Sequence, residues 1–158
     1  MIGMLGSIVF EASSKKIMTI NDMDVSENAR WQKHEVNNVR SRLEFIGDEG
    51  REITLKIGLK AINGVNPKKV LQEFRDMKIN GAVEPFLLGS EIIGKFVIES
   101  MNYSYKFIDK NGIPWDIALS LKLSEYCEET LEDVKKTNNT YKKKSKGTLN
   151  YTTGQVSY

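Results

Sequence analysis

Two residue types that build many protein sites are scarce in this chain of 158 residues. Cys127 is the one cysteine, so no intramolecular disulfide can form and no set of thiolate ligands exists for a structural zinc ion. His34 is the one histidine, which excludes histidine-rich metal centres and the H-E-x-x-H motif. These scarcities predict a protein without a disulfide framework, a metal site or a cofactor.

Long hydrophobic runs are missing as well. Residues 1–10 are apolar, but they lack a basic segment and reach Glu11 too soon for the hydrophobic region of a signal peptide. No later stretch approaches the roughly 20 apolar residues that cross a membrane. We therefore expect no membrane partner, and a chain that is made in a cytosol and stays there unless a larger particle carries it out.

Neither sign of charge is in large excess, since the sequence contains 23 Lys and Arg and 21 Asp and Glu. The net charge of +2 is too small to attract nucleic acid or anionic lipid through the field of the whole protein. Its distribution is uneven, because residues 1–126 hold 17 charges of each sign and residues 127–158 hold the remaining excess. The end of the chain is polar and lacks apolar periodicity. We predict one globular domain over 1–126 and an extended tail over 127–158.

Alternation of apolar and polar residues dominates the first 126 positions. In 52–60 the odd positions are aliphatic and the even ones polar or glycine, and 115–123 repeats the pattern. A period of two is typical of a strand with one buried face. Residues 7–10 and 17–20 are expected to form a shorter pair of strands near the N-terminus.

Two hairpins are predicted from turn residues between such strands. In the first, 43–46 turns through Gly47-Asp48-Glu49-Gly50 into 52–60. In the second, 92–107 turns through Asp109-Lys110-Asn111-Gly112 and returns along 113–126. Antiparallel strands joined in this way favour a mainly β domain.

One helix interrupts the strands. Asn66 suits the N-cap, Pro67 suits the first helical position, and Gly81 suits the C-terminal stop. An apolar stripe at helical spacing is formed by Val70, Leu71, Phe74 and Met77. The order of strands, one helix and further strands predicts an α+β, mainly β fold. We expect a β-sandwich or half-barrel of antiparallel strands with one packed helix.

Motifs for chemistry are weak. His34 has no G-x-S-x-G partner motif, and no G-x-x-x-x-G-K-[ST] phosphate loop occurs. Asp22-Met23-Asp24 lacks the glycine and the distal glutamate of a calcium loop, so we expect a solvated loop there. No catalytic, cofactor-binding or metal-binding residue is predicted, and the protein is not expected to be an enzyme.

Aromatic and basic residues leave two interpretations open. Trp31 and Trp115 each lie beside charged residues, and could pack at the rim of the core or anchor an interface. The stretch 99–105 is too polar for a doubly buried strand, so part of it faces water or another chain. In the tail, the lysine run at 142–146 near Tyr151 could contact phosphates or dock on an acidic protein surface, and 148–153 could add a strand to a neighbour's sheet.

The first four fifths of the chain resemble the phage tail protein U (GpU-like) family of contractile-tailed phages and phage-tail-like bacteriocins. The resemblance rests on the order and spacing of several segments and on a helix that ends near Met77. The segments are MLGSIVF at 4–10, ARW at 29–31, LEFIG at 43–47, EITL at 52–55, EPFLLG at 84–89, GKFVIES at 94–100 and LSLKL at 119–123. The tail beyond Cys127 is longer than the family pattern and carries no LysM-like module.

The resemblance implies a non-enzymatic virion protein with a tail-tube-like fold, assembled in the bacterial host cytoplasm. It implies a homo-hexameric ring near the baseplate end of the tube, with tube, sheath and baseplate hub proteins, including a LysM-bearing baseplate neighbour, as partners. A tail terminator or a tail tube subunit is the alternative within the family. The residues expected at these contacts are Arg30, Trp31, Lys95, Glu99, Tyr103, Tyr105, Trp115, Lys142, Lys143, Lys144 and Tyr151.

An alternative outside the family is a small nucleic-acid-binding or regulatory domain that uses the lysine-rich tail. The two classes differ in a measurable way, because phosphate contacts make DNA binding steeply dependent on salt. We favour the structural tail component, for which nucleic acid is not an expected partner.

Overall fold

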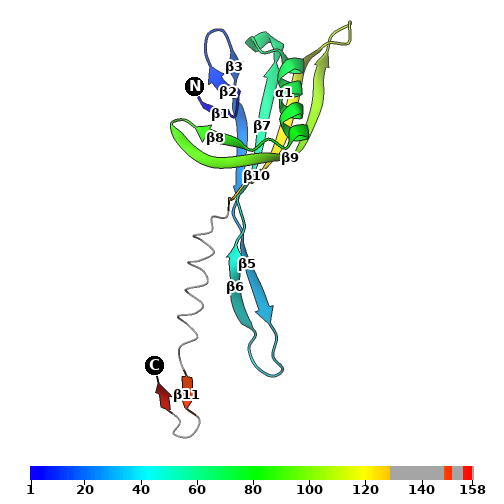
Figure 1. The fold of residues 1–158 in the computed structure, drawn as a ribbon. Coiled ribbons are helices and arrows are strands. Elements are labelled where there is room, and N and C mark those ends of the chain that lie inside the picture. Colours follow the sequence, from blue (N-terminus) through cyan, green and yellow to red (C-terminus); the bar gives the residue numbers. More distant parts are fainter. Residues whose placement is uncertain (129–147, 151–154, 158) are drawn as a thin grey trace. The chain divides into compact units, whose positions relative to one another are not determined.

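The structure is a computed structural model that describes residues 1–128, 148–150 and 155–157. The chain divides into two units, Met1–Tyr126 and Cys127–Tyr158, and each is described by itself. In the second unit, β11 (Thr148–Asn150) pairs antiparallel with β12 (Gln155–Ser157). Every element discussed below belongs to the first unit (Figure 1).

An eight-stranded antiparallel sheet forms the centre of the first unit, with the strand order β3-β2-β1-β8-β9-β10-β7-β4. In that order the strands are Ile17–Met18, Ile8–Ala12, Gly3–Leu5, Glu84–Leu88, Glu91–Ile108, Pro114–Glu125, Glu52–Lys60 and Ile20–Ser26. The outermost strands, β3 and β4, are separated along the chain only by Thr19, so the sheet curls strongly (Figure 1). The predicted mainly β, α+β fold is confirmed.

The core follows from the alternation in β7 and β10. The odd positions of β7 from Ile53 to Leu59 are at most 1% exposed, and those of β10 from Ile117 to Leu123 are at most 2% exposed. The two strands pair in register, with Leu55 opposite Leu121. Their apolar side chains therefore lie on one face, where they bury a continuous hydrophobic layer.

Helix α1 (Pro67–Asn80) covers that apolar layer. The Asn66 side chain accepts a hydrogen bond from the backbone N–H of Lys69 at 3.1 Å, and Gly81 ends the helix in the left-handed conformation. The apolar stripe of the helix packs on the sheet through the buried Val70, Leu71 and Phe74 and the partly buried Met77. The predicted helix, its caps and its buried stripe are confirmed.

A short 3₁₀ helix, η1 (Ala61–Asn63), connects β7 to the loop before α1. Gly64 follows it with φ 72°, and a Cβ atom at Gly64 would collide with the carbonyl oxygen of Lys15. Glycine is required there by both the backbone angle and the close approach.

A two-stranded ribbon continues the chain of β4 and β7 beyond the sheet (Figure 1). It consists of β5 (Ala29–His34) and β6 (Arg42–Asp48), which pair antiparallel. We call residues 29–48 the arm and the rest of the first unit the body. At the base of the arm the Glu49 N–H donates to the Asn28 carbonyl at 2.8 Å, which links the two connecting segments.

The structure overturns two predictions, one in the arm and one in the body. Residues 43–46 do not form a hairpin with 52–60, because β6 pairs only with β5 while β7 pairs with β4 and β10. The glycine-rich segment 47–50 is therefore a joint between successive strands. Asp22-Met23-Asp24 is not a loop but part of β4, in which Met23 packs against the core and Asp22 faces outward toward Lys56.

Candidate assembly surfaces

The described residues contain no group of three His, Cys, Asp or Glu side chains placed to hold a metal ion. None of the helices in this part of the chain is both long and apolar enough to pass through a bilayer. The features that stand out are open strand edges, a polar face of the sheet and apolar side chains exposed at the two ends of the first unit.

Two strand edges of the body are open. Strand β9 pairs with β8 through residues 91–96 and with β10 along the opposite side as far as Ile108. Among the described strands, none pairs with the outer edge of residues 97–108. Strand β4, the last strand of the sheet, pairs with β7 alone. The four-stranded segment β9-β10-β7-β4 thus presents unpaired backbone groups on both sides, which are templates for pairing with another chain.

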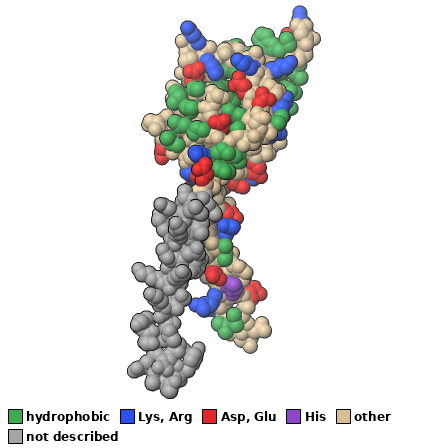
Figure 2. Space-filling view, viewed as in Figure 1, with side chains coloured by type: hydrophobic (Ala, Val, Ile, Leu, Met, Phe, Trp, Pro, Cys, Tyr) green, Lys and Arg blue, Asp and Glu red, His purple; other side chains and the backbone are tan. Residues whose placement is uncertain are grey.

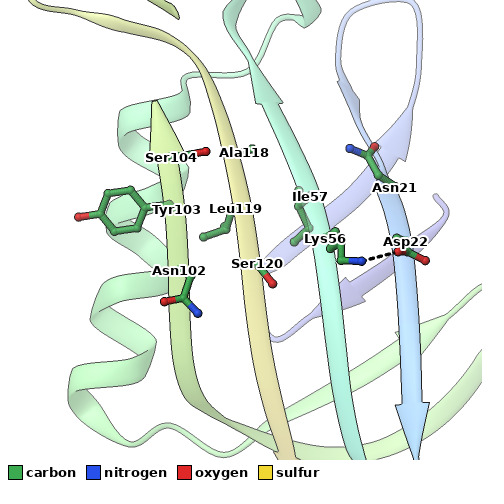
Figure 3. Close-up of a pocket in the computed structure, with 10 residues that line it drawn as sticks. All are labelled: Asn21, Asp22, Lys56, Ile57, Asn102, Tyr103, Ser104, Ala118, Leu119 and Ser120. Carbon is green, nitrogen blue, oxygen red and sulfur yellow. Dashed lines mark hydrogen bonds and ion pairs between the residues drawn. The ribbon is translucent and has the colours of Figure 1, made fainter. Parts of the chain in front are cut away.

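The outer face of this segment is polar and slightly hollowed. A hollow of about 480 Å³ lies over the middle of the four strands, and Figure 3 shows the residues that line it. Asn102, Ser120, Lys56 and Asp22 lie side by side across it in register. The Nζ atom of Lys56 lies 2.7 Å from Asp22, and this contact lowers the pKa of the Asp22 carboxyl and raises the pKa of Lys56.

A second network lies on the same face near the base of the arm. The Ser124 hydroxyl donates to Glu99 at 2.8 Å, and Lys122 lies 3.2 Å from Glu99 and 3.3 Å from Glu52. The Ser124 hydrogen bond is the main reason that the pKa of Glu99 is lowered, with Lys122 adding to it. Both Lys56 and Lys122 are therefore neutralised by carboxylates of the same face, which suits contact with water or polar groups.

The base of the arm is tied to the body by Arg51 and Glu125. The Glu125 carboxylate accepts hydrogen bonds from the Arg51 backbone N–H and from Nε, each at 2.9 Å. The guanidinium also donates to the Ile93 carbonyl at 2.6 Å and lies over the Phe96 ring. Hydrogen bonding from Arg51 lowers the pKa of Glu125. This joint fixes the end of β10, the start of β7 and the β8-β9 hairpin together.

The structure distributes the predicted interface residues over three places. Arg30 and Trp31 lie in β5 of the arm, whereas Lys95, Glu99, Tyr103 and Tyr105 lie in β9 and Trp115 in β10. It brings Tyr103 and Tyr105 together, with ring centroids 5.7 Å apart, and Arg75 donates to the Tyr103 hydroxyl at 3.0 Å. Trp31 and Trp115 are apart, at opposite ends of the strands. Lys142, Lys143, Lys144 and Tyr151 lie outside the described residues.

Both tryptophans are about half exposed, at 57% for Trp31 and 48% for Trp115. The Trp31 ring meets the ring of Phe45 edge to face, with centroids 5.2 Å apart. Neither tryptophan is a core residue of the described unit. An interface role for either residue, and for the other predicted contacts, stays a prediction.

Sequence reasoning missed two groups of exposed apolar residues. Leu43 and Phe45 belong to the segment predicted to form a hairpin with 52–60, but they lie exposed on the arm. Ile62 and Ile113 flank glycine or proline turns and were not singled out, although both are exposed. The available signal was the composition of β5, in which Trp31 is the one large apolar residue, so that strand has no apolar face to bury.

Comparisons with known proteins give one family match and two similar solved structures. The sequence model of the family described as Phage P2 GpU matches residues 6–128. No curated protein matches the chain. Among solved structures, a chain of "Virion of native gene transfer agent (GTA) particle" is similar with 18% identity and a TM-score of 0.40, covering 69% of this chain and 81% of that one.

A chain of "Tail of empty GTA particle computed with helical refinement, C6 symmetry" is similar with 19% identity and a TM-score of 0.41, and the match covers 69% of this chain and 78% of that one. The family match spans more than half of the sequence and includes the whole sheet from β2 onward, the arm and the helix. The chain belongs to the Phage P2 GpU family and is a structural component of a phage tail.

Proposed function

We propose that the protein forms a hexameric ring at the junction of tube and baseplate in a contractile phage tail or a phage-tail-like particle. There it helps to connect the tube, the sheath and the baseplate. The observation that carries this proposal is the four-stranded segment β9-β10-β7-β4, whose outer strands both have an open edge. The number of copies and the position in the particle rest on the family resemblance.

Strand direction supports pairing between copies. Successive strands of the segment are antiparallel, so β9 and β4 at its two sides run in opposite directions. When a copy is rotated about an axis close to the strand direction, its β4 comes beside β9 of the first copy and remains antiparallel to it. The open edges are two different surfaces, and such heterologous contacts make a ring when the rotation closes.

The tail of residues 127–158 has a separate role in the proposal. It carries the net charge of the chain, and Lys142, Lys143, Lys144 and Tyr151 contact adjoining particle proteins. Deletion of 128–158 is expected to leave a folded body and to lower the yield of particles. Normal contractile particles from the deleted chain would reject this clamp.

Disulfide cross-linking tests the ring. In a Cys127→Ser background, Asn102→Cys on β9 is combined in one chain with Asp24→Cys on β4. These positions are separated by two strands, roughly 14 Å at about 4.8 Å per strand, so they cannot bond within one copy. Oxidation of the isolated protein and of particles is expected to give a ladder that ends at the hexamer.

The register of β4 against β9 between copies is not fixed in advance. Cysteines at Asp22 and Ser26 on β4 are therefore also combined with cysteines at Ser100 and Ser104 on β9. The matched control replaces Asp24→Cys by Lys56→Cys, which lies on an interior strand and should give no ladder. If every edge combination stops at the monomer or the dimer, edge pairing in a closed ring is wrong.

A further inference from the structure

The two open edges of the body carry apolar side chains on the core face of the sheet. On the β9 edge, Tyr103 and Tyr105 lie opposite buried residues of β10 and remain 40% and 49% exposed. On the β4 edge, Met23 packs against the core, whereas Val25 on the same face is 48% exposed. Each edge thus leaves apolar surface that none of the described strands covers.

The same two edges carry opposite charges toward the outer face. Along β4 the outer face presents two carboxylates, Asp22 and Asp24. Between Asn102 and Ile108 the one charged residue of β9 is Lys106, which is exposed and has no ion pair within the described residues. An acidic edge and a basic edge are complementary, as expected of two surfaces that meet.

One alignment of the two edges satisfies both faces. In an antiparallel pair, each step forward along one strand is a step back along the other. When Asp22 of one copy lies opposite Lys106 of the next, an ion pair can form on the outer face. The same alignment sets Met23 and Val25 opposite the two tyrosines on the core face.

Other alignments lose one of these contacts. A shift of two residues in one direction sets Lys106 beside Ile20, and a shift of two in the other direction sets Ile108 beside Asp22. Each of these shifts places a charge against an apolar side chain. A shift of one residue would turn the apolar side chains of β4 toward the polar face.

The favoured alignment also fits the geometry of a closed barrel. It sets Ser26 of one copy opposite Asn102 of the next, and Asn102 is level with Lys56 in its own sheet. Ser26 of that next copy is level with Glu52. Successive copies are therefore staggered by the four residues that separate Glu52 from Lys56, and each copy supplies four strands.

This stagger determines how far the strands tilt from the barrel axis. With about 3.3 Å per residue and about 4.8 Å between strands, four residues over four strands give a tilt of about 35°. Strands of closed barrels are typically tilted by about 35–45°. The shift that sets Lys106 beside Ile20 would give only about 19°, and the opposite shift about 46°.

We propose that β4 of one copy pairs with β9 of the next copy in this alignment. Asp22 and Lys106 form an ion pair on the outer face, and Val25 packs on Tyr103 on the core face. The inference rests on the proposed ring and names the residues that set its register. The partner is therefore a second copy of this chain, recognised by charge on one face and by apolar side chains on the other.

Two features of the free molecule prepare this contact. Arg75 of α1 donates to the Tyr103 hydroxyl at 3.0 Å, which holds the ring beside the open edge. The arm extends away from the body (Figure 2), so it leaves the edges of β4 and β9 accessible.

Disulfide scanning with one fixed cysteine tests the alignment. In a Cys127→Ser background, Ser26→Cys on β4 is combined in turn with Ser100→Cys, Asn102→Cys or Ser104→Cys on β9. All charged residues of both edges stay in place. Side chains directly opposite each other have Cβ atoms about 4.5–5.5 Å apart, whereas diagonal ones are about 7–8 Å apart and too distant for a disulfide without movement.

Ser26→Cys with Asn102→Cys is expected to give the hexamer ladder at a yield at least about 5-fold above the other two combinations. Asn102→Cys with Asp24→Cys, which is a diagonal pair, should give the same ladder at a lower yield. A highest yield with Ser100→Cys or Ser104→Cys would overturn the alignment and keep the ring. If no combination passes the dimer, the ring and this alignment are both rejected.

Reversal of one charge tests the ion pair. Lys106→Glu, added to the chain with Ser26→Cys and Asn102→Cys, should lower the hexamer yield by at least about 5-fold at about 0.05 M salt, because it meets the acidic edge of the next copy. The loss should be smaller at about 0.5 M salt, since salt screens the repulsion.

The matched control is Lys110→Glu, an exposed lysine in the turn of the same hairpin, beyond the edge. It should change the hexamer yield by less than about 2-fold. The unfolding midpoint of the monomer should stay the same in both variants, because both lysines are exposed. Equal losses of hexamer for Lys106→Glu and Lys110→Glu would overturn the ion pair.

Discussion

The body and the arm use the same sequence pattern with opposite results. In β7 and β10 the alternating aliphatic residues are at most 2% exposed, because α1 and the curled sheet cover them. In β6 of the arm, Leu43 and Phe45 flank Glu44 in the same way, and they and Trp31, which lies opposite Phe45, are more than half exposed. Alternation thus determines that a strand has an apolar face. It does not determine whether the cover comes from the same chain.

The difference in burial also means that the apolar residues of the body stabilise the fold, whereas those of the arm are available for assembly. Each buried aliphatic or aromatic side chain of the body stabilises the fold by roughly 1.5–3 kcal/mol relative to exposure. The apolar side chains of the arm remain in water, so they contribute little to the folding of one copy. Their contribution is expected in the assembled state, where a partner removes them from water.

The largest expected effect comes from a matched pair of phenylalanines. Phe74→Ala on α1 should lower the free energy of unfolding by about 3–5 kcal/mol, because the side chain is fully buried against the sheet and its loss leaves a cavity. Phe45→Ala on the arm should lower it by less than about 1 kcal/mol, since it loses mainly the edge-to-face contact with Trp31. Chemical denaturation of both variants checks the difference.

An equal loss of stability in the two variants would mean that the arm folds as part of the core. A loss at Phe74 below that at Phe45 would contradict the assignment of the core itself.

The joint between the two regions should have an intermediate effect. The Glu125 carboxylate accepts three hydrogen bonds from Arg51. Glu125→Gln removes its charge and should lower the free energy of unfolding by about 1–3 kcal/mol at neutral pH. Ser124→Ala, on the neighbouring position, removes only an exposed hydrogen bond and provides a control for the substitution.

The pH dependence of this effect has a defined sign. Arg51 holds the pKa of Glu125 in the folded protein below its ordinary value of 4.5. The charged carboxylate therefore stabilises the folded state fully above pH 4.5, and this contribution is lost as the pH falls through the lowered pKa. The stability difference between the wild type and Glu125→Gln should be constant from pH 6 to 8 and shrink below about pH 4.5. A difference that grows in acid would show that the carboxylate is not held by Arg51.

Much of the body follows from local sequence rules, whereas the arm does not. The helix was predictable because Asn66, Pro67 and Gly81 mark its ends and Phe74 lies on its apolar stripe. Strands β7 and β10 were predictable because their alternation is uninterrupted. The arm was mispredicted because a hairpin is inferred from a turn, and Gly47 and Gly50 provide a stronger turn signal than the true turn at Asn38, which takes φ 64°.

The candidate assembly surfaces were harder to predict from the sequence than the arm. Glu99, Tyr103 and Tyr105 were placed correctly on a partly exposed strand, because their segment is too polar for a buried one. The open edges of β9 and β4 depend on strand order, and strand order depends on long-range pairing that local alternation does not encode. A hollow lined by Ala61, Pro67 and Pro114 forms where η1, the helix and β10 meet, which no single segment reveals.

The smallest expected effect concerns exposed side-chain contacts to a carboxylate, one in each region. Lys56 lies 2.7 Å from Asp22 in the body, and His34 lies 2.8 Å from Glu44 in the arm. All four side chains are about half exposed, so solvent weakens both contacts. Asp22→Asn and Glu44→Gln should each shift the unfolding midpoint by no more than about 2 °C at 0.15 M salt. Similar small shifts of the two midpoints would mean that the stability difference between body and arm comes from apolar burial. A clearly larger shift for Asp22→Asn would mean that charge pairing on the outer face of the sheet also contributes to that difference.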